Sequence, residues 1–142
     1  MSAAKLVAVF AENKCGRLAA MTQVIAEAGV NIRWVTIANS DTFGVTKFLV
    51  DQCDKACETL KQKGFTVSLI DVLAIEVADT PGGLHQVADV LARNKINVEN
   101  SSGFVSNKRA VLVIEVKDIP GARVVLQQNN LHLLSQEEVL GL

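Results

Sequence analysis

The sequence of 142 residues has no tyrosine, a single tryptophan and no run of 18 apolar residues. The last absence argues against a membrane-spanning helix. Its first residues, 1–5, lack the basic and apolar regions of a secretory signal peptide. The three cysteines, Cys15, Cys53 and Cys57, are an odd number without a disulfide framework. We therefore expect a reduced, cytoplasmic protein.

The chain also has no large excess of positive or negative charge. The formal net charge is −1, and acidic and basic residues are spread along the chain. This balance gives no electrostatic reason to expect a nucleic-acid or membrane partner. The sequence also lacks a recurring nucleophile–base arrangement, a phosphate-loop lysine motif and clustered metal ligands. We therefore expect no enzyme activity, no metal and no cofactor.

What the sequence has is an internal repeat with a constant offset of 66 positions. Val45–Val50 recurs as Val111–Val116, and Leu60 recurs as Leu126. The repeat needs no gap, and it is longer than the 20–50 residues of a solenoid unit. It therefore indicates a tandem duplication of a small domain, and we place the domains at residues 1–71 and 72–142.

Domains of this size bury too little surface to be robust alone. Hydrophobic residues make up 49% of the chain, which is enough to fill a core in each copy. We expect the copies to pack on each other or on a second chain. A homodimer follows, because small units of this kind leave sheet edges and a bare sheet face to be covered.

Hydrophobic periodicity predicts the order strand, helix, strand, strand, helix, strand in each copy. This is the ferredoxin-like βαββαβ arrangement, an α+β fold with an antiparallel sheet and both helices on one face. We expect Asp51 or Asp54 to cap the second helix, and Asn97 to begin a strand. The apolar stretch 65–78 leaves no room for a polar linker. At the C-terminus, we expect residues 139–142 to pair as a strand with the sheet edge of the first domain.

The loop before the first helix of each copy carries the strongest functional signal. A glycine, Gly16 or Gly82, stands at each helix start, where unpaired N–H groups can bind a carboxylate or phosphate. Asn31 and Asn97 follow the same helices, and an amide can hold an amino group or a carboxylate. The alternative is that the glycines only form tight turns and the asparagines only cap helix carbonyls.

With these motifs, the chain resembles the ACT domain, a small ligand-binding module of amino-acid metabolism. The second copy carries the family's Asp-x-Pro-Gly-x-Leu motif at Asp79–Leu84, then Asn97-Val98. The first copy carries Asn13, Gly16 and Leu18, with Cys15 where proline is usual, then Asn31-Ile32. That loop resembles the serine-binding regulatory domain of phosphoglycerate dehydrogenase, although a loop histidine of that family is Ala11 here.

The resemblance implies an amino-acid ligand held at the interface between ACT domains. The ligand-binding residues that we expect on this basis are Asn13, Gly16, Arg17, Leu18, Asn31, Ile32, Phe43 and Gly44 in the first copy, and Asp79, Gly82, Gly83, Leu84, Asn97 and Val98 in the second. Residues 34–43 could supply side-chain selectivity. Such proteins often carry aromatics in the second strand of the second copy, and here Asn100 and Ser102 stand in that region.

Two functions follow from the resemblance. The first is a non-catalytic regulatory protein that binds a small amino acid and passes the signal to a partner or to its own oligomer. The alternative is a regulatory subunit that docks a biosynthetic enzyme through its sheet edges, with degenerate ligand sites. Binding of an amino acid would favour the first, and co-purification with an enzyme without any ligand response would favour the second.

Overall fold

The computed structural model describes residues 4–142, so residues 1–3 of the expected first domain lie outside the described part. Within it the chain forms two compact units. We call them the N-terminal unit, Lys5–Ile70, and the C-terminal unit, Asp71–Leu142 together with Ala4. In residues 4–142 no helix is both long and apolar enough to cross a bilayer.

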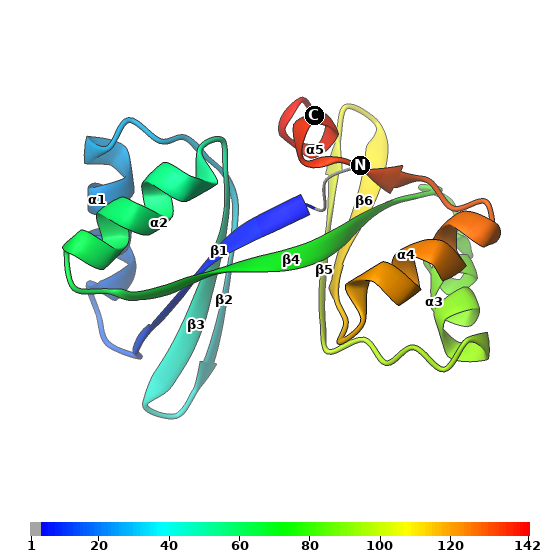
Figure 1. The fold of residues 1–142 in the computed structure, drawn as a ribbon, viewed down its shortest axis with the longest axis horizontal. Helices are drawn as coiled ribbons and strands as arrows, with labels where there is room; N and C mark the ends of the chain where they lie inside the picture. Colours follow the sequence, from blue (N-terminus) through cyan, green and yellow to red (C-terminus); the bar gives the residue numbers. More distant parts are fainter. Residues whose placement is uncertain (1–3) are drawn as a thin grey trace. The chain divides into compact units, whose positions relative to one another are not determined.

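The N-terminal unit contains β1 except for its first residue, two complete strands, two helices and the first part of a fourth strand: β1 (Ala4–Glu12), α1 (Arg17–Glu27), β2 (Ile32–Ser40), β3 (Phe43–Val50), α2 (Cys53–Gln62) and β4 (Thr66–Val77). The strand order is β2-β3-β1-β4, and β3 pairs antiparallel with both β1 and β2. Helices α1 and α2 pack on each other and cover one face of this sheet (Figure 1).

The C-terminal unit repeats this plan and adds one short helix: the rest of β4, α3 (Gly83–Arg93), β5 (Asn100–Ser106), β6 (Arg109–Glu115), α4 (Ile119–Gln128), β7 (Leu133–Leu134) and α5 (Gln136–Leu140). The strand order is β5-β6-β4-β7, with every pair antiparallel. Helices α3 and α4 pack on each other. The prediction of two ferredoxin-like βαββαβ units is confirmed.

The two cores are built from equivalent positions of the repeat. Phe48 and Leu60 are fully buried in the N-terminal core, and Ile114 and Leu126, each 66 residues later, are fully buried in the C-terminal core. Burying one such side chain contributes about 1.5–3 kcal/mol. Each unit therefore has its own hydrophobic core, and the same spacing of apolar residues fills both.

β4 crosses the boundary between the two units without interruption. It runs from Thr66 to Val77, and the boundary falls between Ile70 and Asp71. The prediction that no polar linker separates the copies is confirmed.

The chain end differs from the expected strand. Residues 136–140 form the short helix α5, so the prediction that residues 139–142 pair as a strand is wrong. The cause is local, because Ser135 and Glu138 form a capping box. The Ser135 hydroxyl accepts a hydrogen bond from the Glu138 N–H, and the Glu138 carboxylate accepts one from the Ser135 N–H. Two N–H groups of the first turn are satisfied in this way, and the chain turns into a helix.

The expected caps of α2 are also corrected. Its N-cap is Gln52, which makes no side-chain capping bond. The Asp51 carboxylate instead accepts a hydrogen bond from the Asn31 N–H at 3.0 Å, and Asp54 lies in the first helical turn. Asp51 therefore fixes the entry into β2 rather than the start of α2.

Candidate functional site

Both glycine loops have the same backbone geometry. Gly16 and Gly82 are the N-cap residues of α1 and α3, with φ of 89° and 87°. This left-handed conformation is readily adopted only by glycine. Neither helix has a side-chain capping bond, so N–H groups of its first turn face the loop at the positive end of the helix dipole. Both loops therefore have the backbone of an anion site.

Asn13 ties the first loop to the β2–β3 hairpin. Its side-chain amide donates to the Asp41 carbonyl at 3.1 Å, and its backbone N–H donates to the Thr42 carbonyl at 2.8 Å. The asparagine of the first motif thus holds the loop in place. Asn13 also lines a hollow beside this loop, so it would lie next to a ligand bound there.

A hollow of about 90 Å³ lies between this loop and strands β2 and β3, and we call it the loop pocket. Four of the predicted residues line it, Asn13, Arg17, Leu18 and Gly44. Two more, Ile37 and Asn39, lie in the stretch 34–43 that was expected to supply selectivity. Sequence reasoning missed the other five, Ala11, Glu12, Lys14, Met21 and Thr46. A water molecule takes about 30 Å³ in the liquid, so this space alone suits only a very small molecule.

The charges of the loop pocket come from the two ends of the loop. Glu12 ends β1, and its carboxylate lies 2.8 Å from the Lys14 ammonium and 3.8 Å from the Arg17 guanidinium. The hydrogen bond from Lys14 is the largest cause that lowers the pKa of Glu12. Arg17 is the first residue of α1 and is half-buried. The pocket thus offers a carboxylate for an ammonium group and a guanidinium for a carboxylate.

Glu12 and Arg17 also line a second, neighbouring hollow of about 230 Å³. Three phenylalanines line it as well, Phe10, Phe43 and Phe65. The predicted residue Phe43 therefore lies beside this neighbouring hollow and does not line the loop pocket. Its side chain is 61% exposed, which leaves it free to contact a larger ligand or another molecule.

Asn31 and Ile32 lie at the opposite end of α1 from the loop pocket. The helix has 11 residues, which corresponds to about 16 Å at 1.5 Å per residue. The Asn31 carbonyl accepts from the Asp51 N–H at 3.2 Å, and Ile32 packs against the N-terminal core. The structure therefore does not bring these two predicted residues to the loop of their own unit.

The second copy of the loop is packed differently. Gly83 is buried, and a Cβ at this position would collide with the backbone carbonyl of Ala78. The equivalent position in the first copy is Arg17, whose side chain lines the loop pocket. Asp79 and Leu84 are exposed, and Leu84 is 59% exposed. The second loop keeps the glycine backbone but has no side chain in place of the arginine.

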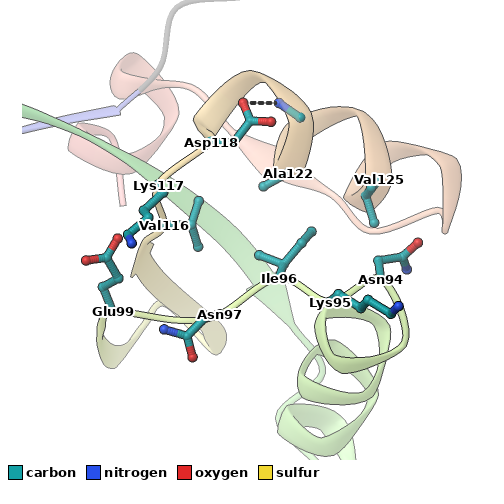
Figure 2. Close-up of a pocket in the computed structure, with 11 residues that line it drawn as sticks. Asn94, Lys95, Ile96, Asn97, Glu99, Val116, Lys117, Asp118, Ala122 and Val125 are labelled. Atoms are coloured by element: carbon teal, nitrogen blue, oxygen red, sulfur yellow. Dashed lines mark hydrogen bonds between the residues drawn. The ribbon is translucent and has the colours of Figure 1, made fainter.

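Asn97 and Val98 lie beyond the other end of α3. They belong to an irregular segment, and β5 begins only at Asn100, so the prediction that Asn97 starts a strand is wrong. Asn97 lines a larger cavity of about 440 Å³ in the C-terminal unit (Figure 2). Gly82 and Asn97 are thus separated by the whole of α3, as Gly16 and Asn31 are by α1.

The cysteines and histidines are placed apart from these hollows. Cys15 is exposed and Cys57 is buried, while burial is the largest cause that raises the pKa of the half-buried Cys53 thiol. No group of three or more possible metal ligands occurs among residues 4–142. Cys53 is therefore disfavoured as a thiolate nucleophile.

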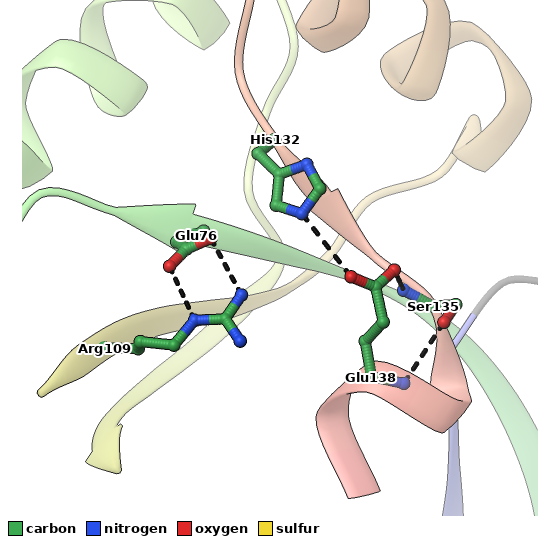
Figure 3. Close-up of polar contacts among 5 residues, drawn as sticks. All are labelled: Glu76, Arg109, His132, Ser135 and Glu138. Carbon is green, nitrogen blue, oxygen red and sulfur yellow. Dashed lines mark hydrogen bonds and ion pairs between the residues drawn. The ribbon is translucent and has the colours of Figure 1, made fainter. Parts of the chain in front are cut away.

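A polar cluster fixes the last part of the C-terminal unit (Figure 3). The Arg109 guanidinium binds both carboxylate oxygens of Glu76, at 2.8 and 2.9 Å. His132 Nε2 lies 3.5 Å from the Glu138 carboxylate. These contacts have a structural role, because they connect β4, β6 and the start of α5.

Comparisons with known proteins identify the family. The chain matches the ACT domain pair family over residues 1–142. A protein of solved structure from Bacteroides thetaiotaomicron is 31% identical, with a TM-score of 0.92, and the match covers 99% of this chain and 97% of that one. No curated protein sequence matches the chain.

A second solved structure shares the fold at lower identity. It is the regulatory subunit of aspartate kinase from Thermus thermophilus, in a ligand-free form. It is 18% identical, with a TM-score of 0.63, and the match covers 90% of this chain and 93% of that one. With two βαββαβ units, a glycine at each helix start and a family match over its whole length, the chain belongs to the ACT domain pair family.

Proposed function

We propose that this protein is a non-catalytic regulatory protein that binds a small α-amino acid in the loop pocket. The observation that carries the proposal is the pairing of Glu12 and Arg17 at the rim of this pocket, beside the N-terminus of α1. An amino acid carries one ammonium and one carboxylate, and these two side chains offer one complementary group for each. ACT domain pairs have a regulatory role, which fits a site that binds without catalysis.

The small volume of the loop pocket narrows the choice of ligand. A space of about 90 Å³ holds little more than the backbone atoms of an amino acid. The neighbouring hollow lined by Phe43 and Phe65 gives room for a side chain, because Glu12 and Arg17 border both spaces. Thr46 is the polar residue buried at the floor of the loop pocket, and Asn39 provides an amide at its wall.

We further propose that a second copy of the chain completes this site. Asn31 lies about 16 Å from the glycine loop of its own unit, so its amide can reach a ligand there only from another molecule. β2 is the outermost strand of its sheet, and it carries two exposed apolar residues, Val35 at 43% and Ile37 at 46%. An antiparallel pairing of two β2 strands would cover these side chains and form a homodimer.

A thermal-shift screen of the full chain against the twenty amino acids tests this function. A ligand at about one hundred times its Kd adds about 2.7 kcal/mol of stability and raises the Tm by several degrees. We expect one or two amino acids to do so. Arg17→Met should abolish the shift, while the control Arg93→Met, on the exposed face of α3, should keep it.

A screen without any shift, for a protein that unfolds cooperatively, would overturn the proposal. The protein would then be better described as a docking subunit for a metabolic enzyme. The exposed apolar residues of β2 are the observation that supports this second function. The oligomeric state of Val35→Lys, measured by sedimentation, further distinguishes amino-acid binding from enzyme docking. Loss of the dimer together with loss of binding would support the site shared between two copies.

A further inference from the structure

One hollow of the C-terminal unit lies at the opposite end of α3 from its glycine loop. It has a volume of about 440 Å³, which is within the range of small-molecule sites. It lies between the irregular segment after α3, the residues that follow β6 and the first turns of α4. We call it the C-terminal cavity.

The C-terminal cavity has an apolar floor. Val116 and Ala122 are buried, and Ile96 and Val125 are half-buried beside them. Figure 2 shows Ala122 and Val125 projecting from α4 toward Ile96. A branched or straight hydrocarbon chain would be removed from water on this floor, at about 25 cal/mol for each Å² that it buries.

Charged groups stand at the rim of this floor. Lys117 and Glu99 lie at one end of the cavity, beside Val116, and Lys95 lies at the other end (Figure 2). Among the residues drawn there, the hydrogen bond is between the Asp118 carboxylate and the Gly121 N–H. The Lys117 ammonium and the Glu99 carboxylate are thus not paired with each other, although both point to the same end of the cavity.

The repeat shows why the cavity is open in this copy. In the N-terminal unit the equivalent of Lys117 is Asp51, which closes the segment through its two hydrogen bonds with Asn31. One of these is accepted by the Asp51 carboxylate from the Asn31 N–H, and a lysine side chain, which has no acceptor, cannot replace it. The equivalent of Asn31 is Asn97, and here it remains in an irregular segment at the cavity wall. The change from a negative charge at Asp51 to a positive charge at Lys117 therefore coincides with the presence of the C-terminal cavity in the second copy.

We propose that the C-terminal cavity is a second ligand site, and that it binds an aliphatic zwitterion such as a branched-chain α-amino acid. Lys117 would bind its carboxylate, Glu99 its ammonium, and Ile96, Ala122 and Val125 its hydrocarbon part. The charged lining residues Lys95, Lys117, Glu99 and Asp118 sum to zero, which favours a ligand without net charge.

This site is independent of the loop pocket. Its lining residues all lie between positions 94 and 125, and none belongs to a glycine loop. The proposal therefore goes beyond the proposed function, which concerns Glu12 and Arg17, and each can fail without the other.

The test is a titration of the ¹⁵N-labelled full chain with L-leucine, followed by the backbone amide signals. We expect saturable shifts at Val116, Lys117 and Ala122. Two analogues that each lack one charge, 4-methylpentanoate and 3-methylbutylamine, should bind about tenfold more weakly or worse, because a hydrogen bond to a charged group is worth about 1.5–3 kcal/mol.

Variants make the test specific. Lys117→Met and Glu99→Gln should each weaken leucine binding by about tenfold or more. Their controls, Lys108→Met in the β5–β6 turn and Glu137→Gln in α5, make the same charge changes on exposed residues outside the cavity and should keep the affinity. Arg17→Met should also leave the shifts at Val116 and Ala122 unchanged.

Two results would overturn the second site. One is the absence of saturable shifts at these three amides with leucine at about ten millimolar, a concentration that detects even a millimolar Kd. The other is equal binding of leucine and of the analogue without an ammonium. A failure of the proposed function would be detected at other signals. In that case the backbone amides of Gly16 and Gly44 would respond to none of the twenty amino acids.

Discussion

Gly44 in β3 lies directly opposite Asn39 in β2, and the Asn39 side chain fills the space where a Cβ at position 44 would stand. The next obstacle is the Ala38 carbonyl, 3.1 Å from that Cβ position. Both Gly44 and Asn39 line the loop pocket. The glycine of the Phe43-Gly44 pair therefore lets an amide from the neighbouring strand lie against the pocket wall.

Gly44→Ala should reduce ligand affinity more than stability. The atom in the way is the end of a flexible side chain, so Asn39 can rotate out and the free energy of unfolding should fall by less than about 1 kcal/mol. The rotated amide would leave the pocket, and calorimetry with the amino acid found in the screen should show weaker binding. The control is Gly103→Ala in β5, whose Cβ would lie 3.4 Å from the Val111 carbonyl. An unchanged affinity in Gly44→Ala would contradict a role for Asn39.

Gly83→Ala should reduce the stability of the protein more than its affinity for a ligand. Here the obstacle is the backbone carbonyl of Ala78, which cannot rotate away. Overpacking of this kind costs about 1–3 kcal/mol, and urea denaturation should show a loss of that size. The equivalent substitution in the first copy, Arg17→Ala, should cost less, because that side chain is half-exposed. Similar losses in the two variants would show that the second loop is not packed as described.

Gln52→Asp should stabilise the protein by transferring a cap from one copy to the other. Gln52 and Asp118 are N-cap residues at equivalent positions of the repeat, but only Asp118 caps its helix, through the Gly121 N–H at 3.0 Å. A capping aspartate contributes about 0.5–2 kcal/mol. Asp118→Ala should lose a similar amount, as measured by urea denaturation. A Gln52→Asn variant distinguishes capping from charge, and a gain confined to aspartate would attribute the effect to the helix dipole.

The ion pair of Glu76 and Arg109 should make stability depend on acid pH. The hydrogen bonds from Arg109 are the largest cause that lowers the pKa of Glu76 below its ordinary value of 4.5. A lowered folded-state pKa gives stability that is present above the ordinary value and is lost as the pH falls through the folded value. Glu76→Gln should therefore be less stable than wild type at pH 7, and the difference should shrink below about pH 4. The exposed Glu58→Gln serves as the control, and a difference that stays constant with pH would exclude this linkage.

The repeat made most of the fold predictable. The same pattern of apolar residues occurs in both copies, so each copy supports the prediction made for the other. Leu60 and Leu126, for example, both lie on the helix face that packs in the core. The glycines at positions 16 and 82 likewise marked two helix starts. The predicted strand start at Asn97 was wrong, and at the equivalent of Asp51, whose carboxylate binds the Asn31 N–H in the first copy, the second copy has Lys117. The contact in the first copy joins residues twenty positions apart, which hydrophobic periodicity does not report.

The lining of the loop pocket was predicted mainly from the loop motif, with Gly44 of β3 in addition. Asn13, Arg17 and Leu18 are close in sequence and could be found from one motif. Asn39 and Thr46 reach the same pocket from two strands, and only the register of the β2–β3 hairpin places them there. The alternation of residues along β2 could have suggested one face, but nothing in the sequence tells which face meets the loop.

By the offset of 66 positions, residues 136–142 correspond to residues 70–76, which lie in β4. They do not repeat that strand, because the chain turns at Ser135 into α5. A helix satisfies most of its backbone N–H and C=O groups internally, so this segment offers no free row of backbone groups to a neighbouring strand. The capping box of Ser135 and Glu138 thus protects residues 136–140 from pairing with an exposed sheet edge of another molecule.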